Sequence, residues 1–539
     1  MPQQRKSQSC DPSGIEPGLY AVSSMSPSPA LTQTAKVRGH GRLLSNSAWN
    51  VGGQLVPLLV GIAVLPLLIR TMGLDRYGFL TLVWVLVGYA SVFDFGIGRA
   101  LIRVVALRLA RDDVTGAHHV ARVGMGFLVV FGLLVGAMFA SGSAWLVGST
   151  FKLPPDLQGE ALHAMWLLAA SLPFVMLTTG YVGVLSAHHE FRGLNIVRAL
   201  MGIASYLGPL IVALWVNRLD AVVAFVLFMR IVATAAHAWL AQRSCGFRYR
   251  PTTPDRATAS ELFSLGGWMS VSNIVGPLLT YLDRLLLSAL VPVRMVALYA
   301  TPFDLASKVM ILPSSLMAAL FPAAAAVRPG SLEARQLLSQ TMRFLFVFTF
   351  PLVFCLVVLA RPGLGFWLGE EFALHAAPVL QLLALGVLMN AVAQGPATLI
   401  QAAGEPRTMA LLHLFELPLF VALVYALTMR YGILGTAAAA ALRNALDAMA
   451  VLMLARRGVA KADLSWRGAV LRGVLSLGLM AAAFWPSSIL QAFTVLVSGS
   501  LLFLTMAWLL LLLPVERACL KELWRTAFAT KVLPNAPSI

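Results

Sequence analysis

Residues 262–327, LFSLGGWMSVSNIVGPLLTYLDRLLLSALVPVRMVALYATPFDLASKVMILPSSLMAALFPAAAAV, decide the fold of this chain. The stretch indicates two apolar helices, each longer than the roughly 20 residues that cross a bilayer. It also carries Asp283, Arg284, Asp304 and Lys308. A charge at mid-membrane costs at least about 2.5 kcal/mol, so such residues normally face a protein interior or a watery cavity. The stretch is therefore typical of a transport pathway rather than of a simple anchor.

Two prolines lie well inside the second helix of this stretch, at Pro302 and Pro313. Proline removes a backbone donor and frees carbonyls, which a membrane helix tolerates where the site is buried or hydrated. We therefore predict hinges at Pro302 and Pro313.

The composition places the whole chain in a membrane. Of its 539 residues, 59% are hydrophobic and 12% are charged, whereas an average globular chain has about twice that share of charge. The composition excludes a soluble enzyme. The net charge of +17 would suit a nucleic acid, but basic residues of membrane proteins gather in cytoplasmic loops and face anionic lipid. We expect the bilayer as a partner, and no nucleic acid.

Apolar runs recur along the chain and predict an all-α polytopic membrane protein with about 14 transmembrane helices. Their limits are 44–69, 78–98, 123–148, 161–187, 194–216, 220–241, 262–291, 295–327, 341–360, 374–402, 408–429, 432–455, 469–486 and 489–513. Loops on the side of the N-terminus hold roughly four times as many Lys and Arg residues as the other loops. Both termini are therefore predicted to be cytoplasmic, in a multi-pass membrane protein.

Basic loops divide these spans into six, six and two. The predicted parts are a disordered cytoplasmic tail 1–42, an N-lobe 43–241, a cytoplasmic linker 242–261, a C-lobe 262–455, two extra helices with a preceding basic loop 456–513, and a cytoplasmic C-terminal tail 514–539. MGLDRYGF before VFDFGIGRA is similar to RMVALYA before PFDLASKV, which aligns Tyr77 with Tyr299. Such a repeat is expected of two pseudo-symmetric lobes.

Four cations within predicted spans are candidates for binding an anionic substrate: Arg230, Arg284, Lys308 and Arg443. Together they would line a vestibule between the lobes and attract negative charge. A structural role is the alternative, because Asp304–Lys308 and Arg443–Asp447 are spaced four residues apart and can neutralise each other on one helix face.

Five acids are candidates for ion coupling or gating: Asp94, Asp283, Asp304, Glu416 and Asp447. Glu416, with His413 one turn earlier, is the best isolated acid for protonation, because burial favours the neutral form of a carboxyl group. Asp94 ends a span between flexible glycines, so it either serves a cavity or reaches toward the membrane surface.

No catalytic pattern is present in the sequence. We find no phosphate-binding Walker loop, no His or Cys cluster with metal spacing, and no Ser/His/Asp pattern. The pairs His118–His119 and His188–His189 are interpreted as solvated loop residues. We expect no enzyme activity, no cofactor and no metal site, with proton or sodium coupling as the open alternative.

Several motifs, taken in order, resemble the polysaccharide transporter family. They are LLIRTMGLDRYGFLTLVWVLVGYASVFDFGIGRAL, DRLLLSAL, ALYATPFDLASKVMILPSSL, FELPLF and GILGTAAAAALR, and they cover about residues 43–455. These Wzx-like flippases of lipid-linked oligosaccharides are relatives of multidrug-and-toxin (MATE-like) exporters and lipid II flippases. The resemblance implies two six-helix lobes around a cationic cavity, and alternating access.

The resemblance also implies the substrate. It would be undecaprenyl pyrophosphate bearing an oligosaccharide repeat unit, moved from the inner to the outer leaflet for O-antigen or exopolysaccharide synthesis. Polysaccharide polymerase and export machinery are candidate partners. Two other functions stay open: a MATE-like ion-coupled exporter of small molecules, which would need cavity acids for cationic drugs, and a membrane polymerase or ligase, which would need a larger outside loop.

Overall fold

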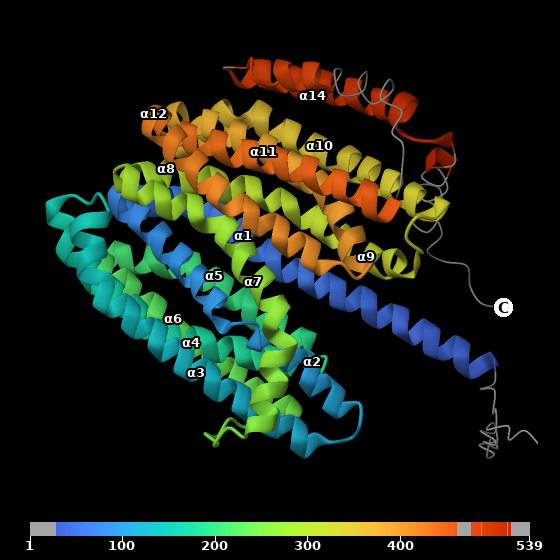
Figure 1. Cartoon of the computed structure of the whole chain (residues 1–539). Helices are drawn as coiled ribbons and strands as arrows, with labels where there is room; N and C mark the ends of the chain where they lie inside the picture. Colours follow the sequence, from blue (N-terminus) through green and yellow to red (C-terminus); the bar gives the residue numbers. More distant parts are fainter. Residues whose placement is uncertain (1–28, 461–475, 487, 515, 519–539) are drawn as a thin grey trace, which may run out of the picture. The chain divides into compact units, whose positions relative to one another are not determined.

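Helices make up almost all of the described chain (Figure 1), and the computed structural model describes residues 29–460, 476–486, 488–514 and 516–518. The α-helices are α1 Pro29–Ala90, α2 Ile97–Leu109, α3 Val114–Trp145, α4 Pro155–Ala187, α5 Phe191–Trp215, α6 Leu219–Cys245, α7 Arg256–Leu290, α8 Val293–Ser307, α9 Ile311–Ala326, α10 Leu332–Leu368, α11 Glu370–Ala402, α12 Pro406–Leu454 and α14 Ile489–Met506. Short turns of tighter or wider helix are η1 Ser91–Asp94, η2 Leu146–Thr150, η3 Lys308–Met310, η4 Ala455–Ala460 and η5 Ala507–Leu511.

Two of these helices are broken at a glycine. The backbone is non-helical at Gly73 in α1 (φ 78°) and at Gly432 in α12 (φ 58°), and glycine adopts such left-handed angles without the strain of a side chain. Across the second break, the hydroxyls of Thr428 and Thr436 lie 2.8 Å apart. Each break lies at or beside a junction between two predicted spans, and the two halves of α12 meet as a hairpin.

The helices form two groups joined by α7 (Figure 1). Helices α2 to α6 pack on one another and make the first group, whereas α8 to α12 make the second group, with α14 against α10. Helix α7 packs on α12 and α8 of the second group and also on α2 and α3 of the first. This arrangement gives α7 contacts with both groups.

The start of α7 is fixed by contacts that the sequence did not reveal. Asp255 caps the helix by accepting a hydrogen bond of 2.8 Å from the amide of Thr258, so α7 begins inside the stretch 242–261 that we predicted as a linker. Asp255 also bonds to His119 of α3 at 2.8 Å. This hydrogen bond lowers the pKa of the Asp255 carboxyl below its usual range.

Two segments are more helical than predicted. Helix α1 begins at Pro29, so residues 29–42 are not the disordered chain that we expected, and proline is favourable at the first position of a helix. The basic stretch after residue 98 is helix α2 rather than a loop, because left-handed residues Phe95 (φ 48°) and Gly96 (φ 76°) end the preceding span and start a new helix.

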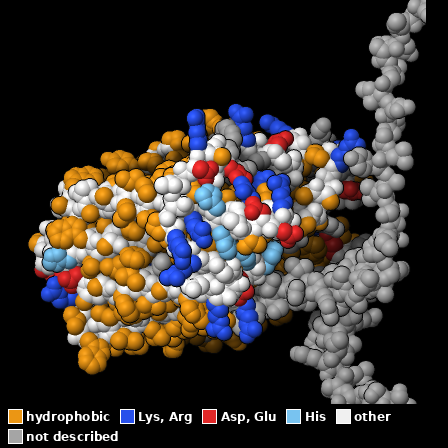
Figure 2. Space-filling view, turned by 90° about the horizontal axis from the view of Figure 1, so that it is seen from below, with side chains coloured by type: hydrophobic (Ala, Val, Ile, Leu, Met, Phe, Trp, Pro, Cys, Tyr) orange, Lys and Arg blue, Asp and Glu red, His pale blue; other side chains and the backbone are white. Residues whose placement is uncertain are grey.

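The surface is that of a membrane protein. Among the described residues, 10 helical segments are long and apolar enough to cross a bilayer. Two of them, Val56–Tyr89 and Arg407–Val459, contain the glycine breaks, so each covers two predicted spans. Figure 2 shows a broad zone of hydrophobic side chains with charged side chains gathered beyond it. The chain is a multi-pass membrane protein, and the count of 14 helices stays a prediction.

The predicted hinge residues flank a tight turn, η3, between α8 and α9. Helix α8 ends at Ser307, η3 follows, and α9 begins at Ile311, with right-handed helical backbone angles throughout. Pro302 lies before this turn and Pro313 directly after it. Pro313 has no amide proton to bond to the carbonyl four residues earlier, which lies within η3. The hinge role of both prolines stays a prediction.

Candidate functional site

Several contacts join the loop at Lys152 and helix α1 to the junction of α7 and α8. The ammonium group of Lys152, between η2 and α4, donates to the carbonyl of Leu290 at 2.6 Å. The amide of Val293 donates back to the carbonyl of Lys152 at 3.2 Å. Gly78 packs on the carbonyl of Val293 so closely that a methyl group there would clash. We call this region, residues 78, 152 and 290–293, the Lys152 end.

Two tyrosines lie just inside the Lys152 end, and both are almost fully buried, Tyr77 at 1% and Tyr299 at 0% exposure. The hydroxyl of Tyr77 in α1 lies 3.2 Å from that of Thr301 in α8. The hydroxyl of Tyr299 donates to Asp283 in α7. The pair that the sequence aligned as a repeat therefore lies at one contact between the groups.

Two pockets that share Trp84 adjoin this contact. The Lys308 pocket has a cavity volume of about 40 Å³ and is lined by Leu58, Gly61, Ile62, Leu65, Tyr77, Trp84, Tyr206, Thr301, Asp304, Leu305, Lys308 and Trp367. The Arg230 pocket has a cavity volume of about 20 Å³ and is lined by Trp84, Met201, Ala204, Ser205, Phe225, Val226, Met229, Arg230 and Ala233. Residues of both groups thus line one of the pockets.

Aromatic rings form the wall between the pockets. The rings of Trp84 and Tyr206 meet edge to face with centroids 5.7 Å apart, and Tyr77 meets Trp84 in the same way at 6.4 Å. On the opposite helix, the indole of Trp367 donates to the carbonyl of Ile62 at 2.7 Å. These contacts fix the orientation of the rings, which is what a preformed binding surface requires.

The four predicted cations do not share one cavity. Arg230 lines its pocket and has no ion pair among the described residues. Lys308 is exposed, and it lines the other pocket. Arg284 and Arg443 line neither. The single cationic vestibule that we expected is therefore divided, because Trp84 and Tyr206 stand between its parts.

Arg284 is a buried cation paired with an acid, and its predicted role in substrate binding stays untested. Its guanidinium binds Asp304 at 2.8 Å and covers the ring of Phe303 at 4.0 Å, and the residue is 4% exposed. Asp304 does not pair with Lys308 as the spacing allowed, because the arginine of α7 is closer. The Asp304 side chain keeps 43% exposure and reaches the Lys308 pocket.

Arg443 likewise does not pair with Asp447. Its guanidinium binds the side chain of Asn444 at 2.6 Å and lies over the ring of Phe420 at 5.3 Å. Asp447 turns instead toward His413, with 3.8 Å between carboxylate and imidazole. The fold of α12 at Gly432 brings these two halves together, which spacing along one helix cannot predict.

His413, Glu416 and Asp447 form a cluster. One ligand atom from each lies within 4.8 Å of the others, and among the described residues this is the group whose side chains could hold an ion. From the sequence we paired Glu416 with His413 and Asp447 with Arg443, and we expected no metal site.

Asp94 serves the backbone rather than a pocket. Its carboxylate accepts a hydrogen bond of 2.8 Å from the amide of Gly96, where α2 begins, and the residue is 9% exposed. This contact supports the start of α2. Its predicted role in ion coupling stays untested.

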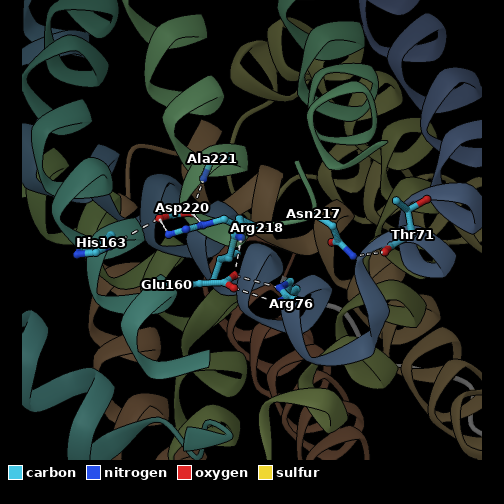
Figure 3. A network of polar contacts seen from close by, with 9 residues as sticks. Thr71, Arg76, Glu160, His163, Asn217, Arg218, Asp220 and Ala221 are labelled. Carbon is cyan, nitrogen blue, oxygen red and sulfur yellow. Dashed lines mark hydrogen bonds and ion pairs between the residues drawn. The ribbon is translucent and has the colours of Figure 1, made fainter. Parts of the chain in front are cut away.

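A polar network joins α1 to helices α4 and α6 of the first group (Figure 3). Glu160 of α4 binds Arg76 at 2.8 Å and accepts from the amide of Leu219 at 2.8 Å. Asp220 binds Arg218 at 2.7 Å. In the sequence these arginines stand out only as loop charges, because no local pattern identifies their partners.

Comparison with known proteins gives a family. A family model described as polysaccharide biosynthesis protein matches residues 67–376. The chain is 29% identical over 423 residues to a Shigella flexneri protein named "Putative O-antigen transporter", covering 77% of this chain and 98% of that protein. It is 22% identical over 390 residues to the lipopolysaccharide biosynthesis protein WzxC of Escherichia coli K12, covering 70% of this chain and 74% of that protein.

Solved structures show the same fold. The lipid II flippase MurJ in an inward closed conformation has a TM-score of 0.64 at 13% identity, covering 86% of this chain and 99% of that one. An inward-facing MATE multidrug transporter has a TM-score of 0.63 at 13% identity, covering 74% of this chain and 94% of that one. With a family model that matches more than half of its length, the chain belongs to the polysaccharide biosynthesis protein family.

Proposed function

We propose that this protein is a flippase for lipid-linked oligosaccharides. It would carry undecaprenyl pyrophosphate bearing a sugar repeat unit from the inner to the outer leaflet of the cytoplasmic membrane, by alternating access. The likeness to an O-antigen transporter over 98% of that protein's length supports this function. The observation that carries the proposal is the pair of adjoining pockets, because their chemistry matches the two parts of such a head group.

The Arg230 pocket suits a phosphate group. A guanidinium presents several donors in a planar fork that fits phosphate oxygens, and a charge-assisted hydrogen bond is roughly twice as strong as a neutral one. Among the described residues, no carboxylate competes for Arg230 with an ion pair. A cation left without a counter-ion at membrane depth is costly, and a bound phosphate would remove that cost.

The Lys308 pocket suits a sugar. The wall of Trp84 and Tyr206 offers aromatic edges and faces against which the apolar face of a pyranose ring can pack. Asp304 and Lys308 supply an acceptor and a donor for hydroxyl groups. Because these two side chains carry opposite charges, the pocket has less preference for an anion than the Arg230 pocket.

The polyprenyl chain would remain in lipid, since lipid is as apolar as a protein interior and burial would gain little. The excess of basic loops predicts cytoplasmic termini, and in that orientation the Lys152 end would lie on the outer side. With that end closed, the pockets would receive substrate from the cytoplasmic side. Moving a negative head group outward is downhill by roughly 2.3 kcal/mol per charge per 100 mV.

Neither of the other candidate functions has comparable support. A MATE-like exporter of cationic drugs would need acids without counter-ions in the pocket, whereas Asp304 is bound to Arg284. A polymerase or ligase would need a catalytic group on a large outside loop.

Transport in liposomes tests the proposal. The purified full chain is reconstituted, and loss of inner-leaflet substrate is followed for three probes: undecaprenyl pyrophosphate with an oligosaccharide, undecaprenyl pyrophosphate alone, and a cationic dye. We expect fast movement of the first probe, slower movement of the second and none of the third. Movement of the dye without the lipids would overturn the proposal.

A further inference from the structure

We propose that His413, Glu416 and Asp447 form a proton-binding site that couples this transporter to a proton gradient, an inference that rests on the proposed function. The three side chains project from the two halves of the α12 hairpin. One ligand atom from each lies within 4.8 Å of the others, and His413 is 3.8 Å from Asp447.

Two oxygens of this cluster have no hydrogen-bond partner. Glu416 is 9% exposed and Asp447 is 8% exposed, and Glu416 Oε2 and Asp447 Oδ1 are buried without a donor. Two buried carboxylates in contact cannot both stay ionised unless a cation joins them. A proton on one carboxyl turns an acceptor into a donor, so a single proton would satisfy both oxygens.

Charge balance favours one positive charge. The cluster holds the carboxylates of Glu416 and Asp447, and Arg443 is the cation that interacts electrostatically with Glu416 and His413. With imidazole neutral, two carboxylates therefore face one cation. One proton closes this gap, whereas a divalent metal ion would leave an excess positive charge at membrane depth. The imidazole also argues against sodium, because hard cations take oxygen ligands.

Arg443 can connect this cluster to the contact between the two groups. It interacts electrostatically with Glu416 and His413 on α12, and also with Asp283 of α7 and Tyr299 of α8. When a proton neutralises Glu416, the electrostatic attraction between Arg443 and the Glu416 carboxyl falls. The attraction between Arg443 and Asp283 is then the stronger of the two. Asp283 accepts a hydrogen bond from the hydroxyl of Tyr299. Tyr299 lies two residues before Thr301, which contacts Tyr77 of α1. Arg443 is therefore a positioning residue between the proton site and the contact that alternating access must break.

Infrared difference spectroscopy of the purified full chain tests for the proton directly. At neutral pH we expect a protonated-carboxyl band that is lost in Glu416→Gln and shifted in Asp447→Asn. The matched control is Glu160→Gln, another membrane-helix acid. It should leave the band unchanged, because Glu160 is held ionised by Arg76 at 2.8 Å. A band that persists in both cluster variants would overturn the proposal.

Added cations separate the proton from its rivals. The band should be unaffected by sodium chloride or zinc chloride at constant pH. Loss of the band on adding either salt would show that a sodium or metal ion is the native occupant, and would overturn the proton site.

Transport separates this inference from the proposed function. In liposomes, the wild-type protein should flip the oligosaccharide lipid faster with an imposed pH gradient than without one. The Glu416→Gln variant should flip the lipid at the same rate with and without the gradient. A wild type that flips at the same rate with and without the gradient overturns the coupling and leaves the flippase function intact. Absence of flipping in every condition overturns the flippase function instead.

Discussion

At the residue scale, the four membrane cations differ in their partners, and the partners decide what each can do. Arg284 is held by Asp304 at 2.8 Å and Arg443 by Asn444 at 2.6 Å. Arg230 lines a pocket, and among the described residues its guanidinium has no ion pair. Among the described residues, Arg230 and Lys308 each line a pocket without an ion pair, so their charges are available to a ligand.

Replacing Arg230 by Ala should reduce flipping about 10- to 100-fold, since a hydrogen bond to a charged group contributes about 1.5–3 kcal/mol. Arg230→Lys should recover part of this loss because it keeps the charge but not the planar fork. The initial rate in reconstituted liposomes measures the effect. The control is Arg430→Ala, an exposed arginine whose guanidinium lies over Tyr431 at 5.6 Å; it should flip normally. Wild-type rates in Arg230→Ala would exclude a role in phosphate binding.

Trp84 is the residue that both pockets share. Trp84→Ala should weaken binding of the oligosaccharide lipid by about tenfold, because a well-placed aromatic contact is worth roughly 0.5–1.5 kcal/mol beyond its buried area. Trp84→Phe should bind nearly as well as wild type. Binding is measured from the change in intrinsic fluorescence on titration with the oligosaccharide lipid. A second titration uses undecaprenyl pyrophosphate without sugar. Equal losses for both lipids in Trp84→Ala would place the sugar elsewhere.

At the scale of elements, function depends on where helices are interrupted. The break at Gly432 turns α12 into a hairpin, so that His413 of one half meets Asp447 of the other at 3.8 Å. The turn η3 lies between Pro302 and Pro313 and carries Lys308 into its pocket. Interruptions of this kind place polar groups at membrane depth without exposing backbone to lipid.

Gly432→Ala should destabilise the protein by about 1–3 kcal/mol, the usual cost of forcing a side chain into a disfavoured backbone region. Nothing lies within 4 Å of the added methyl group, so the loss would report backbone strain and not a clash. Gly126→Ala is the matched control, since that site is equally open and lies within helix α3, where alanine is favoured. Thermal unfolding in detergent compares the two variants. An unchanged Gly432→Ala would mean that the hairpin needs no glycine.

At the scale of the whole molecule, the contact between the two groups at the Lys152 end is the element that alternating access has to open. It consists of two hydrogen bonds, of 2.6 and 3.2 Å, together with the close approach of Gly78 to Val293. Few polar bonds hold it, which suits a contact that forms and breaks in each cycle.

A disulfide across this contact should stop transport. The four native cysteines are first replaced by serine, and Lys152→Cys is then combined with Pro292→Cys, because these two residues pair through their backbones. When this double variant is oxidised, its disulfide should hold the contact closed, so the protein should flip lipid only at the background rate. Reduction of the disulfide should restore flipping. Thr71→Cys with Asn217→Cys joins two residues of the predicted N-lobe, where the Asn217 side chain bonds to Thr71 at 2.9 Å. This control should flip normally when oxidised, whereas normal flipping of the locked pair would disprove opening at the Lys152 end.

The sequence by itself determined the membrane class, the all-helical fold and the family resemblance, because hydropathy and motif order are properties of the chain read in one dimension. It also identified Arg230, Lys308 and Glu416 as ionisable residues at membrane depth, since a charge in an apolar run stands out regardless of the fold.

Only the tertiary structure decided which charges meet. Spacing predicted Asp304–Lys308 and Arg443–Asp447 pairs, but Arg284 takes Asp304 and His413 lies beside Asp447. The partner of Asp304 comes from another helix, and the partner of Asp447 comes from the other half of the α12 hairpin, so spacing along one helical segment cannot predict either contact. The aromatic wall of Trp84 and Tyr206 was invisible for the same reason: in an apolar span, a ring that lines a pocket and a ring that faces lipid look alike.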